Sequence, residues 1–395
     1  MAAAGCIGGL ALRGDWGRLA PLGVRRRGAG ANRVAFIFVI AVGVLLLVLW
    51  NAAAWPQLGP AAETTPEDVS ILIPARDEAA NIVPCLEALR GQAGVREILV
   101  YDDESRDGTP DQVRRLASGW PRVRLIGPEP LPEGWTGKTH ACARLADAAT
   151  GRWLLFLDAD ARLARDAVAR IRAEAERRQA TLLSCWPGLE MHGFWERALM
   201  PLLNFVVFTL YPAPLAFRMQ LPSLGLAHGA CVLCRRDAYL RIGGHARVRG
   251  ELFEDTALAR AWRAAGEVAH CVDGQSAVRT RMYDSFSSIW RGFQKNIYPA
   301  FRRELSFWLF WWFHAAVFVA PFAAVVVAPT AAAWGAAACA WAARGRLARR
   351  FRQPAWSVAL HPLAEALMLA LALVSWHRCR TGHGVEWKGR RWRGR

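Results

Sequence analysis

The sequence predicts an α/β domain on a mainly parallel sheet, with apolar segments that flank the domain on both sides. Between residues 66 and 305, short β-rich runs alternate with helical patterns, which is typical of strands joined by crossover helices. Polar residues follow several of these runs directly, at the edge of such a sheet where ligands bind. Long uncharged blocks lie outside this range, and 53% of all residues are hydrophobic.

Six strands are expected in the α/β domain, each a short apolar run of the buried type. They cover residues 69–73 (VSILI), 97–101 (EILVY), 123–126, 153–157 (WLLFL), 182–185 and 231–234. Four helices are expected between and after them. They cover residues 80–89, a segment that begins near Pro110, residues 139–149 and residues 256–265. Pro110 suits the first turn of a helix, because that turn has no use for its amide hydrogen.

The first apolar block is a predicted membrane anchor. Residues 34–50 carry no charge, and with residues 51–55 they are about long enough to cross a bilayer. A cleaved signal peptide is the alternative, but the run is long for one and no clear small-x-small cleavage site follows. Three more apolar stretches follow the α/β domain: one begins near Phe307, and the others cover residues 331–343 and 356–376. The last contains His361 and Glu365, so it fits the membrane interface as well as a span.

The chain is therefore expected to have five parts. They are a basic N-terminal segment (1–33), a transmembrane anchor (34–55), the α/β domain (66–305), C-terminal membrane segments (306–376) and a basic tail (377–395).

The formal net charge of +17 does not indicate a nucleic-acid partner. The arginines are scattered or lie beside apolar segments, as in the basic loop expected at residues 344–352 and in residues 388–395. No signature of a nucleic-acid-binding module accompanies them. Next to a membrane, such clusters are expected to meet anionic lipid headgroups on the cytoplasmic side.

The nine cysteines are an odd number and show no disulfide framework. Cys231 and Cys234 form a lone CxxC without a second pair or a histidine cluster. We expect them to be small buried residues of a strand, in a reducing compartment, rather than metal ligands or redox groups.

Two carboxylates on one turn follow the strand at 153–157. Asp158 and Asp160 suit a hard divalent cation such as Mg²⁺ or Mn²⁺, with phosphate oxygens of a ligand in other positions. A solvated acidic turn is the alternative, but the position directly after a buried strand favours a metal.

Two further features are placed to contact a nucleotide. Asp102 and Asp103 end the strand at 97–101, where they can accept hydrogen bonds from a base or a ribose. A plain turn is the alternative, because residues 105–109 have turn chemistry. Lys138 opens a helical pattern after a Gly-containing loop, so its amine can neutralise a pyrophosphate with help from the helix N-terminus. The Walker spacing is absent, which argues against a P-loop NTPase.

Together, five motifs resemble family-2 glycosyltransferases of the GT-A fold: VSILIPARDEAANI, ILVYDDESRDGT, GWTGKTHA, FLDADARL and FEDTALARAWRAAG. The resemblance runs from about Val69 to Pro299, with the motifs in the order and at the spacing of that family. The GWTGK loop, the segment SFSSIWRGFQKNIYPAF and the closing VEWKGR resemble bacterial membrane enzymes that glycosylate lipids. These include carotenoid-acid (diaponeurosporenoate) and hopanoid-associated enzymes.

The resemblance implies a Rossmann-like GT-A domain and a role for each motif. The residues implied to bind a UDP-sugar are Pro74, Ala75, Arg76, Glu78, Asp102, Asp103, Lys138 and Asp158. Asp158 and Asp160 are implied to hold Mg²⁺ or Mn²⁺, and Asp255 is implied to be the catalytic base. A helix cap is the alternative role for Asp255, which lies at the head of the helical pattern at 256–265. The Gln-x-x-Arg-Trp signature of processive synthases is missing, so a single transfer is expected.

Three residues outside these motifs are secondary candidates. Arg279 and Arg281 are expected either to reach the diphosphate or the membrane surface, or to be ordinary surface arginines. His228 is expected either to line an acceptor pocket or to have a structural role.

The expected function is inverting transfer of a hexose from a UDP-sugar to a lipid or membrane-embedded acceptor. Transfer to a polyprenyl phosphate is the alternative among enzymes, and a non-catalytic membrane scaffold is the alternative from another class. The expected location is the inner membrane, with several spans and a cytoplasmic α/β domain. Residues 25–27 and Arg33 oppose this orientation, because positive residues before a span tend to stay inside. Either the first segment is a weakly oriented anchor, or the true start lies further downstream.

Overall fold

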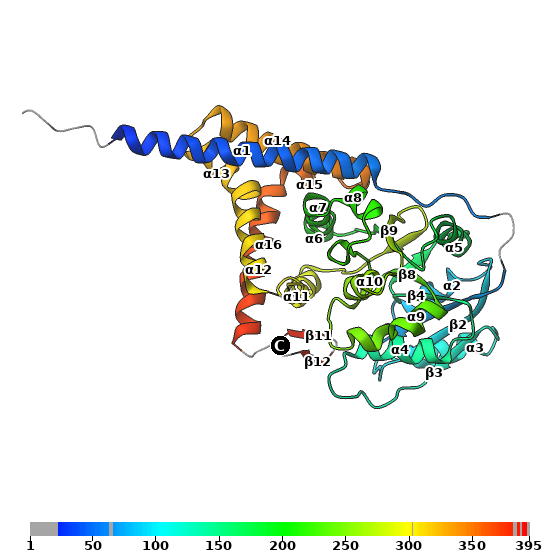
Figure 1. Cartoon of the computed structure of the whole chain (residues 1–395). Coiled ribbons are helices and arrows are strands. Elements are labelled where there is room, and N and C mark those ends of the chain that lie inside the picture. Colours follow the sequence, from blue (N-terminus) through cyan, green and yellow to red (C-terminus); the bar gives the residue numbers. More distant parts are fainter. Residues whose placement is uncertain (1–22, 63–65, 302, 382–384, 388, 393–395) are drawn as a thin grey trace, which may run out of the picture.

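The computed structural model describes residues 23–62, 66–301, 303–381, 385–387 and 389–392. The predicted basic N-terminal segment lies outside the described residues as far as residue 22, and so do parts of the predicted basic tail. The α/β domain is built on a seven-stranded sheet ordered β3-β2-β1-β4-β8-β6-β9 (Figure 1). Its strands are β1 (Val69–Ala75), β2 (Val95–Asp102), β3 (Val123–Ile126), β4 (Trp153–Leu157), β6 (Leu182–Trp186), β8 (Cys231–Arg235) and β9 (Ala269–Asp273).

The six predicted strands are all present, and β9 is an addition. The sheet is mixed, because β8 runs antiparallel to both β4 and β6 while the other neighbours are parallel. Strand β9 has the sequence AHCVD and is buried along its whole length. Its polar residues break the apolar pattern from which a buried strand is predicted. Cys231 and Cys234 are buried free thiols in β8, as predicted.

The hydrophobic core lies on both faces of the sheet, because the central strands are apolar on both sides. Alternation along β1 sends Ile71 and Ile73 to one face and Leu72 to the other. The first face is covered by α2 (Ile82–Glu87), α3 (Thr109–Ala117) and α5 (Ala167–Arg177). The second face is covered by α4 (Gly137–Ala148), α9 (Arg236–Ile242) and α10 (Glu254–Ala264). The polar residues of the candidate site lie instead in the loops at the ends of these strands.

A small second sheet lies beside the turn that carries Asp158 and Asp160. Its order is β5 (Ala161–Leu163), β10 (Val278–Thr280) and β7 (Gly188–Leu189). The middle strand β10 is antiparallel to β5 and parallel to β7. Its two end residues are buried and Arg279 between them is exposed, so β10 presents Arg279 away from the core.

Long helices form a separate region of the chain. Helix α1 (Gly23–Ala54) packs along α14 (Ala331–Arg350), and α12 (Glu304–His314) packs against α16 (His361–Arg380) (Figure 1). A π-helical turn, Ala315–Val319, joins α12 to α13 (Ala320–Val327). Among the described residues, the helices Asn32–Ala54 and Glu304–Val327 are long and apolar enough to cross a membrane.

The remaining described helices are shorter. They are α6 (Phe194–Leu199), α7 (Pro201–Leu210), α8 (Ala213–Arg218), α11 (Phe286–Asn296), α15 (Trp356–Ala359) and the short 3₁₀ turns Pro222–Leu224 and Gly244–Val248. The C-terminal hairpin consists of β11 (Val385–Trp387) and β12 (Arg390–Trp392), and it lies between the end of α16 and the α/β domain in the view of Figure 1.

The expected basic loop at residues 344–352 is wrong. Most of it forms the last two turns of α14, because its Ala, Leu and Arg residues are strong helix formers. Arg344 is buried and donates to Gln353 Oε1 (2.6 Å) and Ser357 Oγ (2.8 Å) rather than facing a membrane surface.

Helix α1 is fastened to the α/β domain by buried hydrogen bonds at its C-terminal end. Asn51 Nδ2 donates to the carbonyls of Phe208 (2.9 Å) and Tyr211 (2.7 Å). Trp55 Nε1 donates to the carbonyl of Cys271 in β9 (2.9 Å). A buried donor left without a partner costs about 1–3 kcal/mol, so these bonds hold the helix end in one position.

Candidate active site

The loops that follow β1 and β2 are held together by backbone amides. The amides of Glu78 and Ala79 donate to Thr109 Oγ1 and Asp107 Oδ2, both at 2.8 Å. Asp77 has a φ of 50°, a left-handed conformation that Asp tolerates better than most residues. The predicted donor loop is therefore rigid and lies against the second acidic loop.

Asp102 and Asp103 lie at the end of β2, as predicted, and both are buried. Asp102 Oδ1 has no hydrogen-bond partner within the described part of the chain. Arg76 Nη1 donates to the Asp103 carbonyl at 2.5 Å, and Asp103 Oδ2 pairs with Arg390 Nη1 at 2.6 Å. Burial raises the pKa of Asp103, and Arg390 offsets part of that rise. A buried acceptor without a partner, such as Asp102 Oδ1, is suited to bind a polar ligand.

Arg390 is a site residue to which the sequence analysis assigns no role. It begins β12 in the C-terminal hairpin, and its guanidinium also contacts Glu104 Oε2 at 3.0 Å. Gly137 leaves the space for this contact, since a Cβ there would collide with the Arg390 guanidinium and the Asp103 carboxylate. The closing VEWKGR motif is the available signal, but Arg390 and Asp103 are 287 positions apart, so only the fold shows that they meet.

Lys138 bridges two acidic side chains from different loops. Its Nζ lies 2.8 Å from Asp158 Oδ1 and 2.8 Å from Glu254 Oε1. Burial opposes the charged amine, but the two carboxylates outweigh burial and raise the pKa of Lys138 well above its ordinary value. Burial also favours neutral Glu254, yet the same amine outweighs it and lowers the pKa of Glu254. At neutral pH the pair is therefore an ammonium and a carboxylate.

Three of the predicted site residues converge on Gly229, in the loop that leads into β8. A Cβ at this position would lie 3.0 Å from Lys138 Nζ, 3.3 Å from Asp255 Oδ2 and 3.6 Å from Asp158 Oδ2. Because β8 is antiparallel to β4, the loop before β8 lies at the same edge of the sheet as the loop after β4. A ligand beside Gly229 would meet one amine and two carboxylates at once.

Two carboxyl groups of the site have pKa values near neutrality. Burial, reinforced by the charge of Glu254, raises the pKa of Asp255 to about 7. Burial, reinforced by the charge of Asp158, raises the pKa of Asp160 to about 7. One oxygen of Asp255 accepts a bond from the Thr256 amide (2.6 Å), while the other faces Gly229. A carboxylate with such a pKa is suited to accept a proton at physiological pH.

Asp158 and Asp160 fit a divalent cation that binds together with a nucleotide. Asp160 Oδ1 is buried and lacks a hydrogen-bond partner among the described residues. Carboxylate oxygens are the ligands that Mg²⁺ and Mn²⁺ prefer. No group of three or more His, Cys, Asp or Glu side chains in the described residues could hold an ion. The other ligands would therefore come from a bound diphosphate and water.

Of the secondary candidates, His228 lies directly before Gly229 in the chain, whereas Arg279 and Arg281 make contacts elsewhere. His228 Nδ1 accepts a bond from the Ala230 amide (3.2 Å), and burial lowers the pKa of His228 to about 4, so the ring is neutral. Arg281 pairs with Glu196 at 2.8 Å. Arg279 lines a separate cavity.

The match to a family model and the names of similar proteins support a glycosyltransferase domain. Residues 70–243 match the family model Glycosyl transferase family 2, and they form a domain of that family. The predicted family is therefore confirmed.

Two curated relatives share the name 4,4'-diaponeurosporenoate glycosyltransferase. The protein of Staphylococcus haemolyticus (strain JCSC1435) is 26% identical over 240 residues, which cover 60% of this chain and 62% of the relative. The protein of Staphylococcus aureus (strain USA300) is 25% identical over 254 residues, which cover 61% of this chain and 66% of the relative. The chain thus matches less than two thirds of the length of either relative.

A solved structure supports the fold. It is a mannosyltransferase from Pyrobaculum calidifontis in complex with GDP-Man and Mn²⁺, with a TM-score of 0.51 and 21% sequence identity. The match covers 87% of this chain and 97% of the other. At this identity the likeness concerns the fold alone, and it confirms a GT-A-like α/β fold with a mixed sheet.

Proposed function

We propose that this chain moves a hexose from a UDP-sugar to a hydroxyl group of a lipid or another membrane-embedded acceptor. The observation that carries the proposal is the convergence of Lys138, Asp158 and Asp255 on the space beside Gly229. A membrane scaffold has no need for two carboxyl groups gathered around one amine at such a point. The names of the curated relatives support a lipid-like acceptor.

The nucleoside end of the donor is assigned to the Asp103 side of the site. Asp102 Oδ1 can accept a hydrogen bond from a base or a ribose, because no described group already donates to it. Arg76 and Arg390 both pair with the neighbouring Asp103 carboxylate, at 3.7 Å and 2.6 Å. The C-terminal hairpin would thereby cover the bound nucleoside.

The diphosphate is assigned to Lys138 and the first turn of α4. Thr136 caps this helix by accepting a bond from the Thr139 amide (3.3 Å), which holds Lys138 at the positive end of the helix dipole. Asp158 and Asp160 would hold Mg²⁺ or Mn²⁺, which when bound supplies Lewis-acid stabilisation of the departing diphosphate. Lys138 adds a fixed positive charge to the same leaving group.

Asp255 is assigned the role of general base. The acceptor oxygen bonds to the anomeric carbon as the bond from that carbon to the diphosphate breaks, and the acceptor proton passes to the Asp255 oxygen that faces Gly229. Glu254, held as an anion by Lys138, raises the basicity of Asp255. One direct displacement inverts the anomeric carbon, so an α-linked donor gives a β-glycoside.

We place the chain in the inner membrane through α1 and the helix Glu304–Val327, with the α/β domain in the cytoplasm. Arg346 and Arg350 lie at the end of α1 nearest this domain, where Arg350 Nη1 donates to the Ala52 carbonyl at 2.6 Å. Positive residues at that end of α1 favour a cytoplasmic location for that end. They act against the opposite orientation, which the arginines before the helix favour. Protease added to intact spheroplasts should leave the α/β domain uncut, and rapid digestion from outside would contradict this placement.

The test of the proposed function combines two measurements. Purified full-length chain, given UDP-hexoses, Mn²⁺ and extracted membrane lipids, should release UDP and form a lipid that carries one additional hexose. Mass spectrometry of lipids from cells with and without the gene should show the same product. Release of UDP with a glycosylated polyprenyl phosphate as product would support the alternative acceptor. Neither UDP release nor a glycosylated product would overturn the proposal.

A further inference from the structure

A second cavity lies on the other side of the small sheet from Asp160. It has a volume of about 460 Å³, within the range of about 300–1,000 Å³ that is typical of small-molecule sites. In β10, Thr280 is buried on the side of Asp160, so strand alternation directs Arg279 to the opposite face and into this cavity. The cavity is therefore separate from the space beside Gly229.

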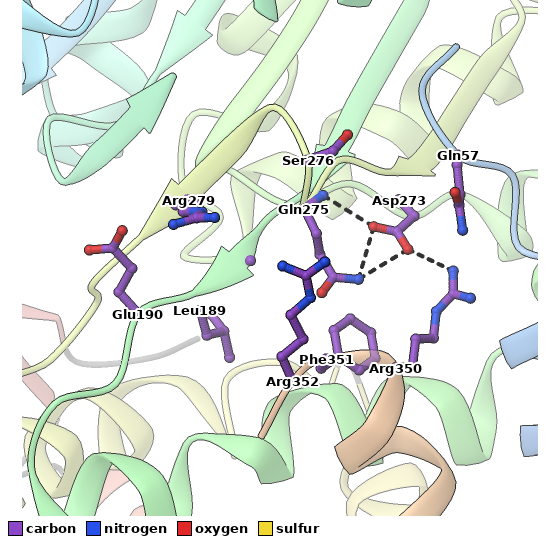
Figure 2. A pocket seen from close by; sticks show the side chains of 11 residues that line it. Gln57, Leu189, Glu190, Asp273, Gln275, Ser276, Arg279, Arg350, Phe351 and Arg352 are labelled. Carbon is purple, nitrogen blue, oxygen red and sulfur yellow. Dashed lines mark hydrogen bonds and ion pairs between the residues drawn. The ribbon is translucent and has the colours of Figure 1, made fainter. Parts of the chain in front are cut away.

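The walls of this cavity come from the α/β domain and from the long helices. The segment that follows α1 contributes Gln57, and the end of β9 with the turn after it contributes Asp273, Gln275 and Ser276. The end of α14 supplies Arg350, Phe351 and Arg352 (Figure 2). The cavity is therefore formed jointly by the long helices and the α/β domain, at the place where the end of the predicted anchor meets that domain.

Arginines dominate the charge of the cavity. Arg350 is already engaged, since it pairs with Asp273 Oδ2 at 2.6 Å. Arg279 and Arg352 have no ion pair or hydrogen bond from their guanidinium groups within the part of the chain that the structure describes. Figure 2 shows Arg352 rising from the end of α14 toward Gln275. With Glu190 as the remaining acid of the lining, the cavity keeps a net positive charge and favours an anion.

Arg352 has a backbone conformation that favours glycine. Its φ is 51°, in the left-handed region where glycine is the favoured residue. It ends α14 in a Schellman arrangement, in which the Gln353 amide donates to the Ala348 carbonyl at 2.8 Å. Glycine would take this position without strain, so an arginine here points to a role for the guanidinium.

The position of the cavity indicates the source of the anion. Gln57 follows the end of α1 by three residues, and Arg350 binds the carbonyl of Ala52 near that end. If α1 crosses the membrane, its end and the cavity beside it lie at the level of the lipid headgroups. Guanidinium groups bind phosphate oxygens in pairs, and phosphate is the anion that membrane lipids present there.

We propose that this cavity binds the phosphate of an anionic membrane lipid between Arg279 and Arg352. The proposal rests on the membrane attachment proposed above and does not depend on the sugar-transfer chemistry. A bound headgroup would join β10 to the end of α14, and so hold the α/β domain at one orientation to the membrane surface.

The test titrates full-length chain in a neutral detergent with dihexanoyl phosphatidylglycerol, dihexanoyl phosphatidylcholine and inorganic phosphate, followed by tryptophan fluorescence. We expect phosphatidylglycerol to bind at least about tenfold more tightly than either other compound. Arg279→Gln and Arg352→Gly should each weaken that binding by about tenfold or more, because each removes charged hydrogen bonds. Arg352→Gly also relieves the left-handed strain, so its thermal midpoint should equal or exceed that of wild type.

Arg115→Ala is the matched control, because it removes one exposed positive charge from α3, away from the cavity, and should leave lipid binding unchanged. Equal binding by wild type and Arg352→Gly would overturn the site, and inorganic phosphate binding as tightly as the lipid would overturn its assignment to a headgroup. Vesicle flotation separates this proposal from membrane attachment itself. If the chain floats with no vesicle, the proposed membrane attachment is wrong. If it floats equally with neutral and anionic vesicles and shows no headgroup selectivity in the titration, only the proposed lipid site in the cavity is wrong.

Discussion

Lys138 Nζ lies 2.8 Å from Asp158 Oδ1, so the amine assigned to the diphosphate is paired with a carboxylate assigned to the metal. Both side chains are partly exposed, at 37% and 29%, so solvent and ligands can reach the pair. A donor that arrives with its cation offers each member a new partner of the right sign. The ion pair therefore neutralises the charges of Lys138 and Asp158 as long as no donor and cation are bound to them.

Lys138→Met should lower the rate of UDP release by about 10²–10³-fold, the usual loss when one electrostatic group that stabilises the leaving charge is removed. Methionine keeps the length and apolar stem but leaves Asp158 and Glu254 without their shared cation. Steady-state UDP release measures the effect, with Arg115→Met as a control for charge loss elsewhere. A Lys138→Met chain that works at the wild-type rate would show that the amine has no part in departure of the diphosphate.

Gly229→Ala should fold and yet lose most transfer activity. The added methyl group would lie 3.0 Å from Lys138 Nζ and 3.3 Å from Asp255 Oδ2, where it displaces the groups that the donor must meet. Gly119→Ala is the matched control, because a Cβ there meets no atom within 4 Å. Thermal midpoints and transfer rates of both variants measure the effect. Comparable rates for the two alanines would contradict the assignment of the space beside Gly229.

Arg390→Ala should raise the KM for the donor with a smaller effect on kcat. Its guanidinium contacts Asp103 and Glu104 on the nucleoside side of the site, away from the breaking bond. Hydrogen bonds to charged groups contribute about 1.5–3 kcal/mol, so a loss of donor affinity of about tenfold or more is expected. Arg390→Lys should recover part of it. If kcat falls instead and the donor KM stays unchanged, the hairpin acts on the chemical step and this account of it is wrong.

Removal of divalent metal should abolish transfer. Asp158 and Asp160 supply only part of a coordination shell, so the ion is expected to bind weakly without nucleotide and to be removed by chelators. Isothermal titration should show Mn²⁺ binding that strengthens when UDP is present, and Asp160→Asn should weaken it. Full activity in excess chelator would exclude the metal from the reaction.

The sequence predicts the parts of this molecule that depend on local pattern. Runs such as VSILI and WLLFL identify central strands because burial on both faces favours apolar residues, and the acidic loops follow directly. The antiparallel direction of β8 has no such local signal, although it brings Gly229 to the site. The contact of Arg390 with Asp103 also depends on the whole fold, since β12 reaches the site only after the chain has passed through its long helices.

The predicted roles of Arg279 and the basic stretch at 344–352 show the same limit. Charge alone suggests that both face a membrane or a diphosphate. The structure buries Arg344 inside the helical region, and it brings Arg279 of β10 and Arg352 at the end of α14 to the walls of one cavity. A sequence pattern gives the number of charged residues, but it does not show which of them lie together in the folded chain.

The most direct test of the proposed function is the pH dependence of sugar transfer by Asp255→Asn, measured at saturating metal. Wild-type kcat/KM should fall as the pH drops through about 7, because the pKa of Asp255 is raised to about 7 and the protonated group cannot accept the acceptor proton. Asp255→Asn should transfer sugar about 10²–10⁴-fold more slowly, without that acidic limb, while donor binding and thermal midpoint stay near wild type. Normal transfer by Asp255→Asn, together with loss of transfer in Glu254→Gln, would contradict the account and assign the base to the other carboxylate.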